Sequence, residues 1–158
     1  MWLHTFDSPI GALYLTGEGE TITGLYFTRP AGPFDAPGAA GRAAEAQLAE
    51  YFAGQRRTFD LPLRAEGTDF QRAVWRALQT IPYGEIRTYG QIAAQIGRPR
   101  ACRAVGMANH RNPISILIPC HRVVGSDGSL TGYGGGLARK ETLLRLEREG
   151  RISTEKPS

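Results

Sequence analysis

The sequence contains few of the residues from which metal sites and disulfides are built. Two cysteines and three histidines occur in 158 residues, and there is no Cys-x-x-Cys pair. Because His4, His110 and His121 are scattered along the chain, we expect neither a structural zinc site nor another cofactor. Two cysteines without a visible targeting segment fit a reducing cytosol, in which a disulfide is unfavourable.

Long apolar runs are also missing. No stretch approaches the roughly 18 apolar residues that a membrane-spanning helix requires. The first residues, MWLHTFDSPIG, lack the basic and apolar regions of a signal peptide. The proportions of hydrophobic residues (41%) and charged residues (22%) are typical of a soluble globular domain. We therefore expect a cytoplasmic protein with no membrane partner.

Positive charge is concentrated in the second half of the chain. Residues 1–80 contain seven Arg and nine acidic residues, a net charge of −2, whereas residues 81–158 contain ten Arg, two Lys and six acidic residues, a net charge of +6. A solvated Arg-rich surface and a site for a polyanionic partner both explain this asymmetry.

Residues 1–64 predict a small N-terminal lobe of β-hairpins and one helix. Runs of β-branched and aromatic residues within residues 2–28 are separated by the turn sequences DSPIG and GEGE. The Pro- and Gly-rich residues 29–41 predict a loop, residues 42–54 an Ala-rich helix, and residues 57–63 a short strand.

Residues 65–158 predict a second, mostly helical lobe, which makes the fold class α/β (α+β). Thr68 and Gln71 form a capping box in front of apolar residues with helical spacing. Thr88 and Gln91 repeat this signal at the start of the next helix.

Residues at about 88–110 predict two short helices joined by a tight turn. This is a helix-turn-helix pattern, although most helix pairs of this kind merely pack together. Small residues recur along the second helix at Ala101, Ala104, Gly106 and Ala108. They favour either close helix packing or a slim helix that enters a narrow groove, with Arg103 acting inside it.

The segment NPISILIPCHRVVGSDG places three reactive side chains directly behind an apolar run, Ile114–Pro119. A buried cysteine such as Cys120 is usually a small hydrophobic residue. Near His121 and Arg122, however, the pKa of the thiol should fall and the thiolate become a nucleophile. Because neighbouring side chains on an extended segment point in opposite directions, contact between Cys120 and His121 requires a water molecule or a sharp turn.

Glu141 shares a predicted helix face with Leu137 and Leu144. A carboxylate on an inward face needs a partner, and His121 would complete a thiol–imidazole–carboxylate relay. The alternative is an exposed ion pair between Glu141 and Arg145 at i, i+4.

Asn112 precedes Pro113, which disfavours a helical conformation at the asparagine. The Asn112 side chain can bond to nearby backbone groups. It is therefore interpreted as a turn residue, as a brace for the cysteine segment, or as both.

Four segments resemble the O6-alkylguanine-DNA alkyltransferases, also called methylated-DNA–protein-cysteine methyltransferases. They are TYGQIAAQIG, RAVGMAN, NPISILIPCHRVVGSDG and TGYGGGLARKETLL. The resemblance is dense over residues 68–147 and looser in the N-terminal lobe, through DSPIGALYL and YFAG. It implies a suicide DNA repair protein that binds double-stranded DNA and flips O6-alkylguanine out of the duplex. The alkyl group would pass irreversibly to a cysteine of the protein, without turnover.

Carried over by position, the resemblance assigns Cys120 as the alkyl acceptor and His121 as the base, acting through a water molecule. Glu141 would orient His121, and Asn112 would brace the active-site turn. The PCHR motif itself is expected on an active-site strand. Tyr89 would donate a hydrogen bond to the flipped base.

The resemblance also assigns residues to the DNA interface, where Arg103 would occupy the space left in the base stack. The recognition helix would enter the minor groove. DNA-facing positions would be Ala101, Ala104, Gly106, Tyr89 and Ser126. The base pocket would be lined by Val123, Tyr133, Gly134 and Gly135. A monomer is expected, with cooperative binding to DNA and a second substrate, O4-alkylthymine, left open.

Three other functions compete with this one. Alkyltransferase-like lesion binders lack the acceptor cysteine, whereas Cys120 is present. A cysteine hydrolase using Cys120, His121 and Glu141 would turn over repeatedly, and a structural domain would leave the thiol inert. Cys102 stands where members of the family often carry Ala and is interpreted as a small side chain.

Overall fold

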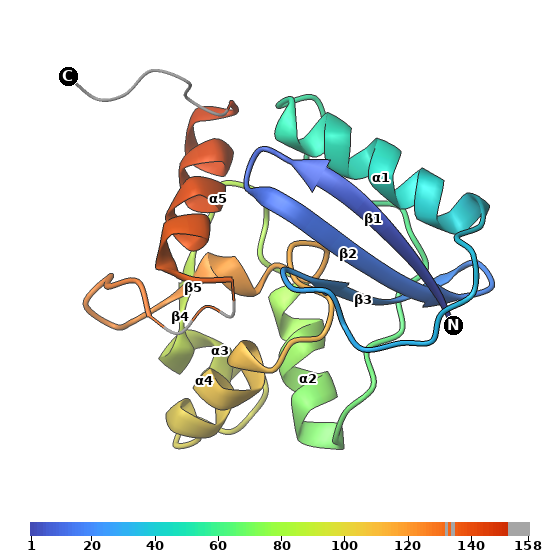
Figure 1. Ribbon diagram of the computed structural model, residues 1–158. Helices are drawn as coiled ribbons and strands as arrows, with labels where there is room; N and C mark the ends of the chain where they lie inside the picture. Colours follow the sequence, from blue (N-terminus) through green and yellow to red (C-terminus); the bar gives the residue numbers. More distant parts are fainter. Residues whose placement is uncertain (132, 134, 152–158) are drawn as a thin grey trace.

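A computed structural model describes residues 1–151 except 132 and 134. An antiparallel sheet forms the start of the chain, in the order β1-β2-β3 (Figure 1). The strands are β1 (Trp2–Ser8), β2 (Gly11–Glu18) and β3 (Thr21–Tyr26). Gly11, the first residue of β2, and Gly19, in the turn between β2 and β3, have φ angles of 109° and 56°, which favour glycine. The hairpins predicted from residues 2–28 are confirmed.

Helix α1 (Ala39–Phe52) packs against the sheet (Figure 1). Its buried side chains are Ala44, Leu48, Tyr51 and Phe52. The helix begins three residues before the predicted start, so the loop that precedes it is shorter than residues 29–41.

The strand predicted over residues 57–63 does not form, and this prediction was wrong. Only Leu63 pairs with β3, through an isolated bridge to Ile22. Ile22 N donates to the Pro62 carbonyl at 2.9 Å, but Pro62 itself has no N–H to donate, so the segment cannot continue a ladder.

The second half begins with α2 (Asp69–Leu78), followed by α3 (Tyr89–Gln95) and α4 (Cys102–His110), which lie together below the sheet in Figure 1. Both predicted capping boxes are present, at Thr68–Gln71 and at Thr88–Gln91. The predicted pair of short helices is thereby confirmed as a structural feature.

A short parallel pair, β4 (Arg87–Thr88) with β5 (Val123–Val124), was not predicted. Between α4 and β5 the chain forms η1 (Cys120–Arg122), one turn of 3₁₀ helix, and the last element is α5 (Leu137–Glu149). Buried apolar residues of both halves belong to one continuous core. Within the described residues, no helix has the length and apolar character to cross a membrane.

Candidate active site

The apolar segment before Cys120 is folded back on itself rather than extended. Ile116 has a φ of 71°, which is unusual for a β-branched residue. Ser115 and Ile118 pair through an isolated bridge, and η1 begins at Cys120. The expectation that the PCHR motif lies on a strand was wrong. The motif instead occupies a sharp turn, one of the two arrangements that a contact between Cys120 and His121 requires.

Two asparagines hold this turn. Asn112 Nδ2 donates to the Ile118 carbonyl at 2.8 Å, and Asn112 Oδ1 accepts from Ile114 N at 3.0 Å. Asn109 Nδ2 donates to the Cys120 carbonyl at 3.2 Å. Asn112 therefore occupies the position expected of a brace, and Asn109, which sequence reasoning missed, supports the cysteine itself.

The Cys120 thiol is buried, and only 3% of the residue is exposed. Burial raises the pKa of the Cys120 thiol, an effect that a hydrogen bond with Asn112 and the positive charge of Lys140 offset only in part. The expected depression of the thiol pKa was wrong. The guanidinium of Arg122 is engaged elsewhere, so desolvation of the thiolate dominates.

His121 is bound to Glu147. Its Nε2 lies 2.6 Å from Glu147 Oε2, and both side chains are buried. The partner expected at this position, Glu141, is exposed and forms an ion pair with Arg145 at 2.9 Å. The assignment of Glu141 to His121 was therefore wrong.

The error came from choosing the wrong face of α5. Leu137, used to define the inward face, is 51% exposed. The buried stripe runs through Lys140, Leu143 and Glu147, at spacings i, i+3 and i+7. A lysine and a glutamate on that stripe look polar in the sequence, and this concealed it.

Glu147 receives more than one donor. Arg122 donates to it through Nε (2.7 Å to Oε1) and through Nη2 (3.0 Å to Oε2), and Tyr51 Oη donates to Oε2 at 2.5 Å. Burial by itself would raise the pKa of the Glu147 carboxyl, but His121 and Arg122 hold that pKa well below its usual range. The carboxylate is thus ionised and accepts hydrogen bonds only.

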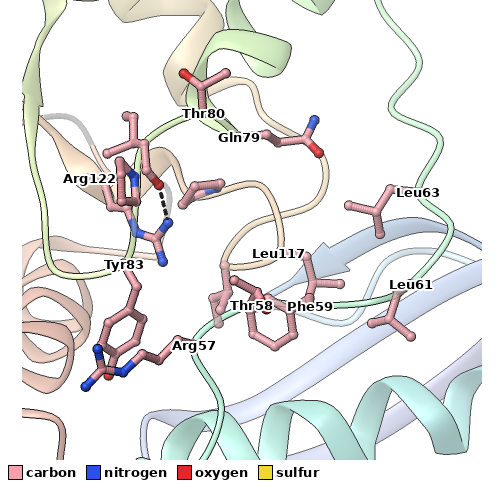
Figure 2. A pocket seen from close by; sticks show the side chains of 14 residues that line it. Arg57, Thr58, Phe59, Leu61, Leu63, Gln79, Thr80, Tyr83, Leu117 and Arg122 are labelled. Atoms are coloured by element: carbon pink, nitrogen blue, oxygen red, sulfur yellow. Dashed lines mark hydrogen bonds between the residues drawn. The ribbon is translucent and has the colours of Figure 1, made fainter.

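Arg122 also ties this cluster to the segment that follows α2, and it lines a neighbouring hollow (Figure 2). Its Nη1 donates to the Ile81 carbonyl at 2.7 Å, the contact drawn as a dashed line. The hollow has a volume of about 350 Å³. Arg57 and Tyr83 lie together at its edge, with the Arg57 guanidinium carbon 5.3 Å from the centre of the Tyr83 ring.

Lys140 connects the thiol region to the segment that precedes α5. Its ammonium donates to the Val123 carbonyl at 2.6 Å and to the Thr131 carbonyl at 2.9 Å. Burial lowers the pKa of Lys140, while the charge of a Cys120 thiolate would raise it. Sequence reasoning missed this residue, although a lysine at i, i+3 from Leu143 was a signal.

A larger hollow, of about 750 Å³, opens beside α3 and α4. Its lining includes Tyr89, Arg103, Gly106, Ser126 and Thr131. Tyr89 Oη contacts the Thr131 hydroxyl at 3.1 Å and the Thr131 carbonyl at 3.3 Å. Thr131 therefore links this hollow to Lys140, and through Lys140 to the thiol.

The small residues of α4 do not form one face. Ala104 is exposed and Ala101 is half-buried, but Ala108 belongs to the core. The Ala108 carbonyl accepts from the Trp75 indole at 2.8 Å. Arg103 is exposed on the same helix.

The predicted base-pocket residues are buried where the structure describes them. They are Val123, Tyr133 and Gly135, whereas Gly134 lies outside the described residues. A Cβ atom on Gly135 would lie 2.6 Å from the Phe27 ring, so glycine is needed there. Across the parts of the chain that are described, no three His, Cys, Asp or Glu side chains come together as metal ligands.

Two family models match the chain. The model described as 6-O-methylguanine DNA methyltransferase, DNA binding domain, matches residues 69–149, which is more than half of the chain. The corresponding ribonuclease-like domain matches residues 1–65. The chain belongs to the 6-O-methylguanine DNA methyltransferase family. The resemblance carried by the IPCHRV context and its neighbouring segments is confirmed.

Relatives within this family match the chain along most of their length. A methylated-DNA–protein-cysteine methyltransferase of Mycolicibacterium paratuberculosis is 57% identical over 91% of this chain and 90% of its own. One of Methanosarcina acetivorans is 50% identical, with coverages of 93% and 98%. The OGT protein of Mycobacterium tuberculosis, crystallised in complex with DNA, has a TM-score of 0.92 at 50% identity, covering 97% of this chain and 96% of that one. The mixed α/β fold class is confirmed.

Proposed function

We propose that this protein repairs O6-alkylguanine in double-stranded DNA by transferring the alkyl group to its own Cys120. A bond forms between Cys120 Sγ and the alkyl carbon while the bond from that carbon to guanine O6 breaks, which restores guanine. The thioether is stable, so each chain reacts once. The observation that carries the proposal is a cysteine on a sharp turn beside a histidine held by a buried carboxylate, in a member of this family.

In this proposal, His121 accepts the thiol proton. The ionised Glu147 can only accept hydrogen bonds. His121 Nε2 therefore carries a proton and donates a hydrogen bond to Glu147 Oε2. Nδ1 of the neutral ring is then the basic nitrogen, and among the described residues it has no hydrogen-bond partner. A bridging water molecule would carry the proton from Cys120 Sγ to Nδ1.

The burial of Cys120 implies that the resting thiol is neutral and protected. We propose that an incoming base enters at the hollow beside α3 and separates the contact between Tyr89 and Thr131. Tyr89 would then donate its hydrogen bond to the base, and the Lys140 ammonium would stabilise the thiolate as it forms. Asn112 holds the turn, and Val123, Tyr133 and Gly135 line the pocket.

We propose that α4 contacts the minor groove and that Arg103 fills the gap left by the flipped base. The net charge of +6 in residues 81–158 suits a polyanionic partner. Positions proposed to face the DNA are Ala101, Ala104, Gly106, Tyr89 and Ser126. In this division, residues 1–64 form a supporting lobe and residues 65–158 form the DNA-binding and alkyl-acceptor domain. The protein would act as a monomer in the cytoplasm, where it meets the DNA, and O4-alkylthymine is proposed as a second substrate.

Mass spectrometry after mixing with a duplex that contains O6-methylguanine tests the proposal. We expect a gain of one methyl group per chain, located on Cys120, and no gain in Cys120→Ala. Cys102 provides the internal control, because it is the exposed thiol of the two. Cys102→Ala should react like the wild type. Methylation of Cys102, or guanine release in excess of protein, would contradict a suicide transfer to Cys120.

The second arm compares Arg103→Ala on two substrates. Repair of the duplex should slow strongly, while reaction with free O6-alkylguanine base should change little, because a free base has no stack to fill. Equal losses on both substrates would remove this role from Arg103. Repeated turnover on a small ester would instead favour the cysteine hydrolase.

A further inference from the structure

Glu147 Oε2 is the point at which the two halves of the chain meet at the active site. It accepts from His121 Nε2 at 2.6 Å, from Arg122 Nη2 at 3.0 Å and from Tyr51 Oη at 2.5 Å. The first two donors neighbour Cys120 in the chain. Tyr51 comes from α1, 96 positions before Glu147.

The Tyr51 side chain is held in place on every side. It is fully buried, and its ring lies 5.3 Å from the ring centres of Phe52 and Phe59 and 6.2 Å from that of Tyr83. Burial raises the pKa of the Tyr51 hydroxyl well above its ordinary value, and the charge of Glu147 raises it further. The hydroxyl therefore stays protonated and directs its single proton to Glu147.

The donors compete for the negative charge of one oxygen. A carboxylate oxygen that accepts a strong bond from Tyr51 has less charge available for His121. Loss of the Tyr51 hydroxyl would leave that charge to His121 and Arg122. The imidazolium form of His121 would gain stability, and the ring would accept the thiol proton at a higher pH only.

We propose that Tyr51 is a positioning residue for alkyl transfer, which sets the proton affinity of His121 by sharing Glu147 Oε2. The inference rests on the proposed function of Cys120 and His121. In this inference, the N-terminal lobe takes part in the chemistry through the Tyr51 hydroxyl, which does not contact the flipped nucleobase.

Other titratable and charged groups act on Glu147 and Tyr51 from the elements packed around them. For Glu147 they are His121 and Arg122 on η1, Tyr51 on α1, Tyr83 between α2 and β4, and Tyr133 before α5. For Tyr51 they are Glu147, Arg122 and Tyr83. Only the Tyr51 hydroxyl both reaches Glu147 from the N-terminal lobe and leaves the charge of the cluster unchanged when it is removed.

The test is the pH dependence of the single-turnover methyl transfer rate in Tyr51→Phe, measured on duplex DNA. The midpoint of the acid limb should rise by about 0.5–1 pH unit. This is less than the roughly 1–2 units that a hydrogen bond to a charged group can supply, because Tyr51 acts on His121 only through the shared carboxylate. At a pH well below the midpoint, a rise of one unit corresponds to a rate about 10-fold lower. At high pH, the rates of variant and wild type should converge.

Tyr83→Phe is the matched control. Tyr83 loses the same atom close to the same cluster, but its hydroxyl donates to the Leu146 carbonyl at 3.4 Å and not to Glu147. Its pH midpoint should equal that of the wild type. An unshifted midpoint in Tyr51→Phe, whatever its thermal stability, would reduce Tyr51 to a packing residue and overturn the inference.

The two proposals can fail separately. Methylation of wild-type Cys120 decides the proposed function, and the midpoint of Tyr51→Phe decides the role of the hydroxyl. Should Tyr51→Phe not fold, proton NMR of the wild type provides the test. A slowly exchanging Tyr51 hydroxyl proton close to the His121 Nε2 proton is expected, and a rapidly exchanging hydroxyl would refute the shared carboxylate.

Discussion

Glu141 and Glu147 lie on the same helix and have opposite surroundings. Glu147 is 4% exposed and binds His121, Arg122 and Tyr51, whereas Glu141 is exposed and pairs only with Arg145 among the described residues. Exposed ion pairs contribute little to stability. Removal of a buried carboxylate, in contrast, leaves its cationic partners buried without a counter-charge, which costs much more. At the scale of single residues, burial therefore decides which glutamate matters.

Replacement of each glutamate by glutamine measures this difference. Glu147→Gln should lower the free energy of unfolding by about 3–5 kcal/mol, because Arg122 remains buried without its counter-charge. Alkyl transfer should also slow strongly, since His121 loses the negative charge of its acceptor. Glu141→Gln should change the free energy of unfolding by about 0.5 kcal/mol or less and leave the rate unaltered. Urea unfolding and single-turnover kinetics give the two readouts, and similar behaviour of both variants would contradict the assignment of Glu147.

Among the helices, α2 and α3 both begin with a capping box, but the two boxes hold different side chains in place. Thr68 accepts from Gln71 N and Thr88 accepts from Gln91 N, each at 3.1 Å. Helix α3 has seven residues and starts with Tyr89, whereas α2 has ten residues and packs through its buried Trp75. The cap of α3 therefore holds Tyr89, for which we propose a contact with the flipped base, whereas the cap of α2 holds only core residues.

Threonine-to-alanine variants at the two caps should distinguish an effect on stability alone from an effect on stability and repair. Thr68→Ala and Thr88→Ala should each lower the free energy of unfolding by about 1 kcal/mol, since each removes one N-cap hydrogen bond. Only Thr88→Ala should slow repair of duplex DNA, because Tyr89 is the first residue of the helix that frays. Chemical denaturation and repair rates provide the comparison. Equal repair rates in the two variants would show that Tyr89 does not depend on its cap.

At the scale of the whole molecule, a buried cluster joins the N-terminal lobe to the last helix. Tyr51 belongs to α1, Arg122 to η1 and Glu147 to α5, and all three are buried. The apolar core is continuous across the same boundary. Loss of the Glu147 charge should therefore be felt as a loss of global stability rather than as local fraying.

The contribution of ionised Glu147 to the free energy of unfolding should depend on pH. The pKa of Glu147 is held below its usual range in the folded chain, whereas in the unfolded chain it is about 4.3. The stabilisation from this group is thus complete above that value and is lost as the pH falls through it toward the folded pKa. The difference in unfolding free energy between the wild type and Glu147→Gln should be largest near pH 7 and shrink toward pH 3. A difference that stays constant with pH, measured by urea titration, would contradict an ionised Glu147.

Local patterns were sufficient wherever neighbours in the chain decide the structure. The hairpins, both capping boxes and the short pair α3–α4 depend on contacts over a few residues, and the sequence predicted them. The segment around residues 57–63 failed, because its strand-like composition includes Pro62, which cannot continue the pairing with β3. The short parallel pair β4–β5 joins positions 36 residues apart, Arg87 with Val123, and two-residue strands carry no pattern.

We could read from the sequence the family, the adjacency of the proposed acceptor Cys120 to His121, and the order of the hairpins and the helices, because short motifs and helix signals are written in adjacent residues. Three-dimensional packing was needed to show that Glu147 rather than Glu141 holds His121, that Tyr51 shares this carboxylate, and that burial raises the pKa of Cys120. Those outcomes depend on which helix face turns inward and on which groups exclude water from one another, and both are properties of the packed chain.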